Sequence, residues 1–562
     1  MRELVDAFYA ERSIVNHHIA SYNDFLSHRL QHVIDNIRIG DDDTSERGVV
    51  QTDIEGYFIK LGKISIGRPV VKEADGSLRP LTPMESRLRN LTYQAPLSLE
   101  FIPVIDGIEH EPELVQVGRL PIMVHSSHCN ITRKVLEETE GRPLSPDEYK
   151  AKLVDLQEDP LDPGGYFISN GTERVLITLE DLAPNRVLVE KATRYGTDVE
   201  IAKVFSQHEG YRALVVVERK KDGDLMVTVP SASGQIPLVV LLRALGMESD
   251  EEIVHAIQSD GQMEPLILGN IESAAEEYGV QTREDAIAYL GKRLAGGQAK
   301  EYRVKRVEAL MDRNLLPHLG QEPEDRITKA IFLARMGQAV FELFLGLREE
   351  DDKDHYANKR LKLAGDLMED LFRVAFMALC KDLKYQLERA HARNRDVKIQ
   401  TAVRADVLTQ RLLHSLATGN WVSGRAGVSQ LLDRTSNLAA LSHMRRVTSP
   451  LTRSQPHFEA RDLHSTQWGR LCPNETPEGP NCGLVKNLSL CVEISEGFPE
   501  REVERVLRDF GLRPVERDSQ EAQVYLNGDL VGLHGALQGP QVPARARPRQ
   551  EPRRQDPDRG PG

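Results

Sequence analysis

The stretch that decides the fold lies between residues 449 and 488. It begins with Ser449-Pro-Leu-Thr-Arg-Ser-Gln-Pro-His-Phe-Glu-Ala-Arg-Asp-Leu-His464 and continues with Thr466-Gln-Trp-Gly-Arg-Leu-Cys-Pro-Asn-Glu-Thr-Pro-Glu-Gly-Pro-Asn-Cys-Gly-Leu-Val-Lys-Asn-Leu488. Arginines alternate here with Ser, Thr, Gln and His, whose side chains suit contacts with phosphate and sugar. Prolines stiffen the loops because they fix φ. The stretch therefore favours a rigid basic loop that follows a nucleic-acid backbone without reading its sequence.

A second interpretation stays open on composition alone. The arginines could form a solvated face in which they pair with Asp433, Glu459 and Asp462. Glu475 and Glu478 could act as a general acid and base. In so proline-rich a stretch we expect them instead to shape a rigid loop through backbone hydrogen bonds.

Charge is distributed unevenly along the chain. The net charge of −14 argues at first sight against a nucleic-acid partner, because phosphate binding needs a positive surface. However, eleven acidic residues and one basic residue lie between Glu248 and Asp285, whereas six arginines and two acidic residues lie between Arg434 and Arg470. An acidic module and a basic module share the chain, so its total charge does not exclude nucleic acid.

Length and composition indicate several globular domains. A chain of 562 residues is too long for one compact core. Its longest uncharged apolar stretch, residues 236–242, is far shorter than the roughly 20 residues of a membrane-spanning helix. The five cysteines include no C-x-x-C pair, and the N-terminus has no apolar export segment. We therefore expect a cytoplasmic protein without a membrane partner, a zinc site or disulfides.

Periodicity predicts an α+β fold, multidomain and built from β-hairpin modules and helices. A helix is expected from about residue 21 to 37, started by Ser21 and Asp24. Hairpin turns are expected at residues 75–76, 170–171, 222–223 and 527–528. The acidic stretch and residues 326–346 and 361–389 favour helices. From residue 539 the chain is rich in Pro, Arg and Gln, which is typical of disorder.

Catalytic motifs are sparse. The chain has no phosphate-binding loop, no G-x-S-x-G elbow and no H-E-x-x-H helix. The run Asp351-Asp-Lys-Asp-His355 resembles a metal cluster, but consecutive side chains point in different directions. A solvated or ion-paired loop is the better interpretation of that run.

The sequence resembles a known family, the second-largest (β-like) subunit of multisubunit RNA polymerase, in its archaeal version. Residues 417–421, 425–436, 441–447, 449–464 and 466–488 look like the fork of that subunit, and residues 85–93, 118–124, 164–175 and 352–361 look like protrusion motifs. Trp468-Gly469, Cys482 and the loop from Ser454 to His457 resemble the archaeal more than the bacterial version. The resemblance runs in family order over roughly residues 10 to 535.

The resemblance implies a division of the chain. We expect an N-terminal helical segment (1–40), a protrusion in two parts (41–189 and 351–410) and a lobe inserted between them (190–350). A fork (411–495), part of an external domain (496–538) and a disordered tail (539–562) follow. Protrusion and lobe would form one side of the DNA cleft, and the fork would lie near the active centre.

The resemblance also implies the roles of particular residues. The expected neighbours of nucleic acid or of the active centre are Arg174, Gln430, Asp433, His443, Arg446, Arg453, Glu478 and Asn481. No catalytic or metal-binding residue is expected, because the Mg²⁺ ligands of this family belong to the largest subunit. The expected partners are that subunit, other polymerase subunits, a complementary C-terminal half, the DNA template and the RNA–DNA hybrid. The isolated chain should be catalytically inert.

Two other classes of function compete with this one. One is a free-standing DNA-binding regulatory protein derived from the same module. The other is a hydrolase that uses Glu475, Glu478 and His464.

Overall fold

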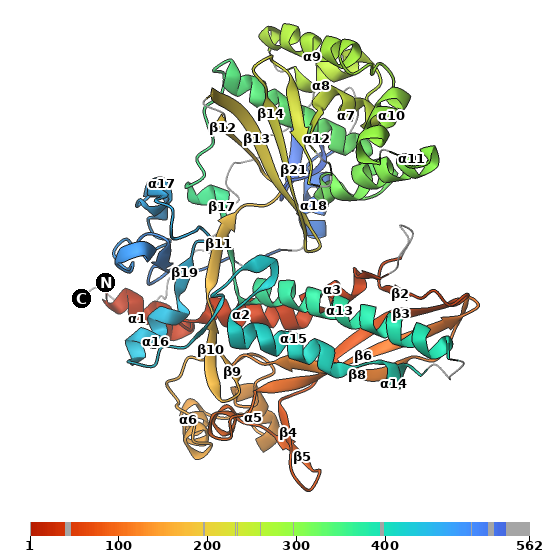
Figure 1. The fold of residues 1–562 in the computed structure, drawn as a ribbon. Helices are drawn as coiled ribbons and strands as arrows, with labels where there is room; N and C mark the ends of the chain where they lie inside the picture. The colour runs from red at the N-terminus through yellow and green to blue at the C-terminus, as the bar shows by residue number, and fades with distance from the viewer. Residues whose placement is uncertain are drawn as a thin grey trace.

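The computed structural model describes residues 2–39, 46–194, 197–230, 232, 234–258, 260–295, 297–393, 398–495, 497–498, 500–514 and 522–535. Figure 1 shows two bodies, one above the other, joined by strands that run between them. The tail predicted from residue 539 lies outside the described residues. Within the described part, no helix is long and apolar enough to cross a membrane.

The lower body is built on a sheet with the order β1-β2-β3-β6-β7, in which β8 pairs with β6. Its strands are β1 (Arg38–Ile39), β2 (Val49–Gln51), β3 (Tyr57–Ile66), β6 (Gln94–Ile105), β7 (Ile108–Glu109) and β8 (Glu113–Pro121). Its helices are α1 (Arg2–Glu11), α2 (Asn16–Asp24), η1 (Phe25–Arg29), α3 (Leu30–Asp35), α4 (Pro83–Leu88), α5 (Arg133–Glu140), α6 (Pro146–Asp155), α13 (Ala364–His391), α14 (Ile399–Ala402) and α15 (Ala405–Thr418). The predicted hairpin at residues 75–76 is formed by β4 (Val70–Lys72) and β5 (Leu78–Pro80).

Helices that are more than 300 residues apart in the sequence pack together in the core of this body. The ring of Phe25 in η1 lies 6.3 Å from the ring of Phe372 in α13. A Cβ on Gly365 would lie 2.1 Å from the carbonyl oxygen of Ser21, so only glycine allows α13 to approach α2 this closely. Each buried aromatic side chain contributes about 1.5–3 kcal/mol.

The predicted N-terminal helix exists, but its predicted start was wrong. The helix begins at Asn16, and Ser21 and Asp24 lie inside it. Neither acts as a cap, because other partners engage both: the Ser21 hydroxyl accepts from the Gly365 N–H (3.0 Å), and Asp24 accepts from Arg29, five residues later in the same helical run (2.5 Å). Similarly, residues 359–362 form strand β17, and the helix expected from residue 361 begins at Ala364.

The upper body has its own core. Its antiparallel sheet has the order β12-β13-β14-β15-β16, with β12 (Val187–Arg194), β13 (Thr197–His208), β14 (Tyr211–Arg219), β15 (Leu225–Thr228) and β16 (Gln235–Pro237). Its helices are α7 (Leu238–Leu245), α8 (Asp250–Ile257), α9 (Glu264–Glu276), α10 (Arg283–Leu294), α11 (Lys300–Ala309) and α12 (Arg326–Phe344). The helices predicted for the acidic stretch and the hairpin at residues 222–223 are confirmed.

A central sheet joins segments that are far apart in the sequence. It has the order β17-β11-β19-β20, formed by β17 (Lys359–Lys362), β11 (Thr178–Leu182), β19 (Arg446–Thr448) and β20 (Val485–Asn487). A neighbouring sheet has the order β18-β10-β9, formed by β18 (Ser429–Leu431), β10 (Thr172–Leu176) and β9 (Phe167–Ser169). The predicted turn at residues 170–171 is confirmed as the turn between β9 and β10.

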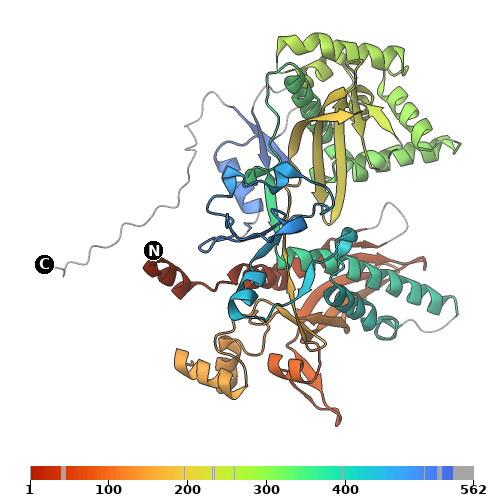
Figure 2. The same ribbon diagram turned by 60° about the vertical axis from the view of Figure 1, so that its left-hand side comes forward.

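The last described elements are helix α18 (Glu500–Asp509) and the predicted hairpin β21 (Ala522–Leu526) and β22 (Asp529–His534). Leu530 of this hairpin belongs to the apolar core of the upper body. Figure 2 shows α18 and the hairpin beside the upper body, while α1 extends from the lower one.

Candidate nucleic-acid interface

The basic segment, residues 434–470, carries α16 (Asn437–Met444), α17 (Phe458–Arg461) and strand β19, connected by loops, and strand β20 follows it. Of its six arginines, Arg434 forms ion pairs, with Glu173 (2.6 Å) and Asp162 (3.7 Å). No ion pair joins the other five arginines to a carboxylate in the described ranges. The alternative in which the arginines pair with Asp433, Glu459 and Asp462 is therefore wrong.

Three of these arginines bind backbone carbonyl oxygens instead. Arg445 donates to Ile14 (2.7 Å) and Ser489 (2.5 Å). Arg461 donates to Pro456 (2.7 Å), Pro480 (2.8 Å) and Cys482 (2.8 Å). Arg470 donates to Thr466 (2.8 Å). A carbonyl oxygen does not cancel a positive charge, so these arginines hold the loops together and keep the segment positive.

Of the three arginines predicted to approach nucleic acid, Arg446 and Arg453 lie in the basic segment, and neither has a side-chain partner in the described part of the chain. Arg453 is exposed on the loop that Arg461 organises. Arg446 begins β19, and its Nε is buried without a hydrogen-bond partner. Nearby, His457 adopts a left-handed conformation (φ 39°), which costs about 1–2 kcal/mol for a residue with a side chain. The loop thus combines an unpaired cation, Arg453, with a strained backbone at His457.

The structure brings Gln430, Asp433 and His443 together. The Asp433 N–H donates to Nδ1 of His443 (3.1 Å), so Nε2 must carry the proton, and it lies 3.0 Å from Oε1 of Gln430. The amide of Gln430 then donates to the Gly427 carbonyl (3.0 Å). Burial, and secondarily the Arg446 charge, lower the pKa of His443 to about 4. This histidine is neutral at neutral pH and fixes the turn after β18.

Arg174 joins the same group through strand pairing. It lies opposite Leu431 where β10 pairs with β18, and its Nε is buried without a partner. Asn481 and Glu478 lie instead beside the Arg461 loop, where Oδ1 of Asn481 is buried and unpartnered and Glu478 is exposed. The predicted residues therefore form two groups, one on β10, β18 and α16 and the other around Arg461.

The expectation for Glu475 and Glu478 was partly wrong. Glu475 accepts from the Ser442 hydroxyl, and no backbone N–H bonds either carboxylate in the described part. Thr476 shapes this loop instead, since its hydroxyl donates to Val485 (2.9 Å) and accepts from the Gly483 N–H (2.9 Å). His464 bonds to Asp352 (2.8 Å), so the three residues of the hydrolase hypothesis are not linked to one another.

A buried ionic cluster lies in the central sheet. Lys486 Nζ donates to Glu180 (2.7 Å), the Tyr356 hydroxyl donates to Glu180 (2.9 Å), and Ser449 donates to it as well. Lys359 Nζ lies 3.6 Å from the same carboxylate. Burial raises the pKa of Glu180, but Lys486 and Lys359 lower it more, so the net pKa lies below its ordinary value. The cluster connects strands β11, β17 and β20 with Ser449, which directly follows β19.

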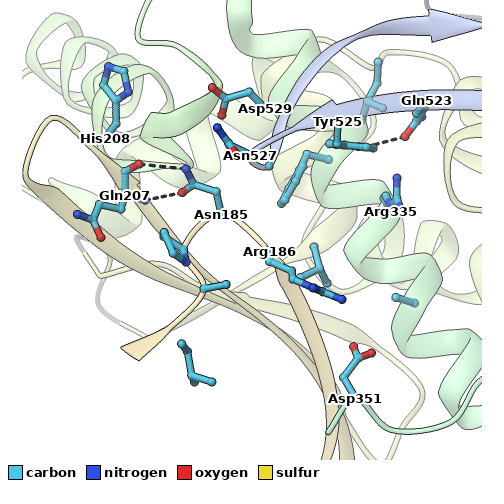
Figure 3. A pocket seen from close by; sticks show the side chains of 18 of the residues that line it. Asn185, Arg186, Gln207, His208, Arg335, Asp351, Gln523, Tyr525, Asn527 and Asp529 are labelled. Carbon is cyan, nitrogen blue, oxygen red and sulfur yellow. Dashed lines mark hydrogen bonds between the residues drawn. The ribbon is translucent and has the colours of Figure 1, made fainter. Parts of the chain in front are cut away.

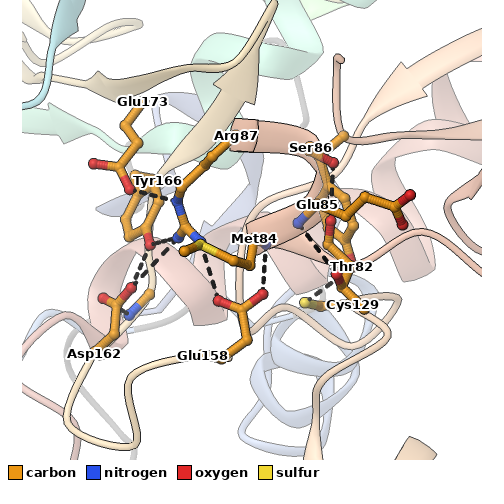
Figure 4. Close-up of polar contacts among 12 residues, drawn as sticks. Thr82, Met84, Glu85, Ser86, Arg87, Cys129, Glu158, Asp162, Tyr166 and Glu173 are labelled. Carbon is orange, nitrogen blue, oxygen red and sulfur yellow. Dashed lines mark hydrogen bonds and ion pairs between the residues drawn. The ribbon is translucent and has the colours of Figure 1, made fainter. Parts of the chain in front are cut away.

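A second network fastens helix α4 to β10 (Figure 4). Arg87 donates to Glu173 (2.8 Å), Glu158 (3.0 Å) and the Tyr166 hydroxyl (2.5 Å). Arg434 donates to the other oxygen of Glu173 (2.6 Å), so one carboxylate holds two arginines. Sequence reasoning missed this network and the Glu180 cluster. Charged residues inside apolar strands, such as Lys486 between Val485 and Leu488, were the available signal.

The acidic run at residues 351–355 forms an ion-paired loop, as expected. Asp351 accepts from the Val189 N–H (2.9 Å), Lys353 pairs with Glu190, and Asp354 pairs with Lys359 (3.2 Å). In the part of the chain that the structure describes, no three His, Cys, Asp or Glu side chains are grouped so that they could hold a metal ion.

An open cleft of about 2340 Å³ separates the two bodies and was not predicted. Figure 3 shows Asn185, which bonds to Gln207, facing Asn527 and Asp529 of the C-terminal hairpin. Its lining carries charges of both signs, including Arg335, Arg373, Glu369 and Asp529. This mixed lining offers no uniformly positive path for a phosphate backbone, unlike the basic segment.

Comparisons with known proteins show which family the chain is similar to. Residues 13–410 match the family described as "RNA polymerase beta subunit", and residues 430–494 match "RNA polymerase Rpb2, domain 3". The chain is 53% identical over 517 residues to DNA-directed RNA polymerase subunit Rpo2N of Methanocaldococcus jannaschii, covering 91% of this chain and 99% of that protein. It is 50% identical to subunit Rpo2N of Halobacterium salinarum over 94% of this chain and 99% of that one. It is 48% identical to subunit Rpo2 of Saccharolobus solfataricus, of which it covers 46%.

Proposed function

Because this chain belongs to the RNA polymerase beta subunit family and is a subunit of an archaeal DNA-directed RNA polymerase, we propose that its basic segment borders the nucleic acid near the active centre. The chain corresponds to the N-terminal half of a second-largest subunit that is divided between two polypeptides. RNA synthesis is an activity of the assembled enzyme. These similarities do not favour a free-standing regulatory protein.

We assign the parts of the chain as follows. Residues 1–40 form an N-terminal helical segment, residues 41–189 and 351–410 form the protrusion, and residues 190–350 form the lobe. Residues 411–495 form the fork, and residues 496–538 belong to an external domain. Strand β11 of the protrusion pairs with β19 of the fork, which supports a fork that is held rigidly against the protrusion.

Within the described residues, five of the six arginines between Arg434 and Arg470 form no ion pair, and this observation carries the proposal. A buried cation that lacks a carboxylate partner is costly, and an exposed one stays strongly hydrated, unless another anion is nearby. A phosphate backbone supplies such anions at regular spacing. Arg453, exposed and unpaired on a loop that Arg461 pins to three carbonyl oxygens, is placed to contact it.

The group of predicted residues on β10, β18 and α16 has a supporting role in this proposal. His443 and Gln430 fix the turn that carries Asp433, beside Arg446 and Arg174. We propose that the DNA template and the RNA–DNA hybrid pass this surface. The magnesium ions of the reaction would be held by the largest subunit, and this chain would position nucleic acid without supplying a metal ligand.

Reconstitution of the polymerase tests the proposal. Complexes assembled with this chain should synthesise RNA from a template, and complexes lacking it should not. A photo-crosslinker at position 453 should label template or hybrid in a stalled elongation complex. The same crosslinker at position 142, an exposed arginine near α6 in the lower body, should label neither. Label at both positions or at neither would contradict the assignment of the basic segment.

A further inference from the structure

Helix α18 carries an apolar stripe that the described part of the chain covers only in part. Val503, Val506, Leu507 and Phe510 recur at three- and four-residue spacing, which places them on one face. Nevertheless, none of the residues of α18 is buried. Val506 is 51% exposed and Phe510 is 58% exposed, and Phe498, just before the helix, is 68% exposed. An amphipathic helix of this kind ordinarily buries such a stripe.

The helix is nevertheless fixed in place. The Asn527 side chain donates to Glu500 at its start (2.6 Å). After its end, the backbone of Arg513 bridges to Leu533 of strand β22 through hydrogen bonds of 2.8 and 2.9 Å. Nε2 of His534 also lies 3.2 Å from the Phe510 carbonyl oxygen. The hairpin therefore presents α18 as a formed helix with its stripe covered only in part.

The rim of the stripe suits a protein partner. The polar side of α18 carries three arginines and four acidic residues, Arg501, Arg505, Arg508, Glu500, Glu502, Glu504 and Asp509. Charges of both signs around an apolar centre are typical of protein–protein interfaces. Helices that lie on membranes carry mainly Lys and Arg on the polar side instead.

The divided architecture indicates which protein covers the stripe. Undivided relatives such as the Saccharolobus solfataricus subunit contain a second half that this chain lacks, because only 46% of that protein is matched. In an undivided subunit, this second half follows the elements around α18 in the chain. Contacts that are internal in one polypeptide become an interface when the polypeptide is divided. An apolar face left open on the last described helix is where such an interface is expected.

We infer that the Val503–Val506–Leu507–Phe510 face of α18 is a docking surface for the polypeptide that forms the complementary second half of the subunit. The inference rests on the proposed function, since it assumes a chain that works inside the divided polymerase. Docking would bury the stripe at the centre of the contact and leave the charged side of α18 at its rim.

Binary association of the two purified halves tests this inference. Val506→Glu places a charge in the middle of the stripe and should weaken binding of the second half by about tenfold or more, because a buried unpaired charge is costly. Arg505→Glu, on the opposite side of the same helix, is the matched control and should change the dissociation constant by less than about twofold. Both positions are exposed, so circular dichroism of the free chain should be unchanged.

A crosslinker at position 506 identifies the occupant in the assembled polymerase. Crosslinking to the second half supports the inference. Crosslinking to another subunit or to a second copy of this chain overturns it, and so does unchanged affinity of the Val506→Glu chain. If the proposed function itself is wrong, the wild-type chain will not enter the polymerase. If only this inference is wrong, wild-type and variant chains will both enter it with equal affinity.

Discussion

Lys486 donates a hydrogen bond from Nζ to Oε1 of Glu180 at 2.7 Å, across 306 positions of the sequence. Both side chains are almost fully buried, at 5% and 3% exposure. A buried ion pair adds little net stability, but losing one partner is costly because the other charge stays buried. The pair therefore helps to fix which strands meet in the central sheet, since it joins β20 to β11.

The Glu180→Gln substitution should destabilise the chain by about 3–5 kcal/mol, because it leaves Lys486 buried beside Lys359 without a counter-charge. The free energy of unfolding, measured with urea, checks this. The same change at Glu138, which forms an exposed pair with Arg68, should cost at most about 1 kcal/mol. Adding Lys486→Met to Glu180→Gln should restore part of the lost free energy of unfolding. If the effects of the two substitutions simply summed, the two residues would not be acting as an ion pair.

His443 should make the turn after β18 sensitive to acid. Its pKa in the fold is about 4, against 6.5 for the free side chain, so the unfolded chain takes up a proton first as the pH falls. Stability that is present above pH 6.5 is therefore lost between pH 6.5 and 4. Nuclear magnetic resonance of the histidine ring should show no protonation above about pH 5.

Substitutions at the same position separate charge from hydrogen bonding. His443→Asn keeps an acceptor near the Asp433 N–H and cannot become charged, so it should remove this acid sensitivity with a modest loss of stability. His443→Ala leaves that N–H unpaired and should cost about 1–3 kcal/mol. Equal melting temperatures for the two variants would contradict the hydrogen-bond assignment.

Arg453→Ala should weaken the elongation complex without affecting the fold. Its side chain has no described partner, so the melting temperature should stay within about 1 °C, in keeping with a change below about 0.5 kcal/mol. Dissociation of stalled complexes, measured against salt concentration, should show a slope reduced by about 1. Arg461→Ala should behave differently, because it releases three carbonyl oxygens and should destabilise the loop. Arg142→Ala controls for loss of charge alone.

The hairpin of β21 and β22 should dock against the upper body more tightly in mild acid. Burial, with the Glu500 charge adding to it and His208 opposing it, raises the pKa of Asp529 to about 7 from the model-peptide value of 3.8. The docked state thus holds a proton that the undocked state loses, and stability present below pH 3.8 is lost as the pH rises to 7. Hydrogen exchange of residues 522–534 should accelerate from pH 5 to 8 beyond its intrinsic rate. Asp529→Asn should abolish this acceleration beyond the intrinsic exchange rate. If the acceleration persisted, a titrating group other than Asp529 would be its cause.

Local patterns predicted the elements that depend on local chemistry. Asn170-Gly171 and Asn527-Gly528 gave their hairpins, since these pairs favour the positive φ that tight turns need. The helix at residues 16–35 was predicted in kind but not in its start, because Ser21 and Asp24 look like caps and are instead engaged by Gly365 and Arg29. The preference of Ser21 for a helix start does not decide its place, because its hydroxyl hydrogen-bonds to a residue far away in the sequence.

The sequence by itself determined the fold class, the family and the basic segment. Those properties depend on residue type, spacing and charge, which can be taken from the chain directly. Only the tertiary structure decided that carbonyl oxygens rather than Asp433, Glu459 and Asp462 engage Arg445, Arg461 and Arg470. It also decided that Glu180 meets Lys486 and that α18 keeps an open apolar face. The physical reason is that pairing and burial depend on which distant segments meet, and no local spacing encodes the distance between atoms hundreds of residues apart.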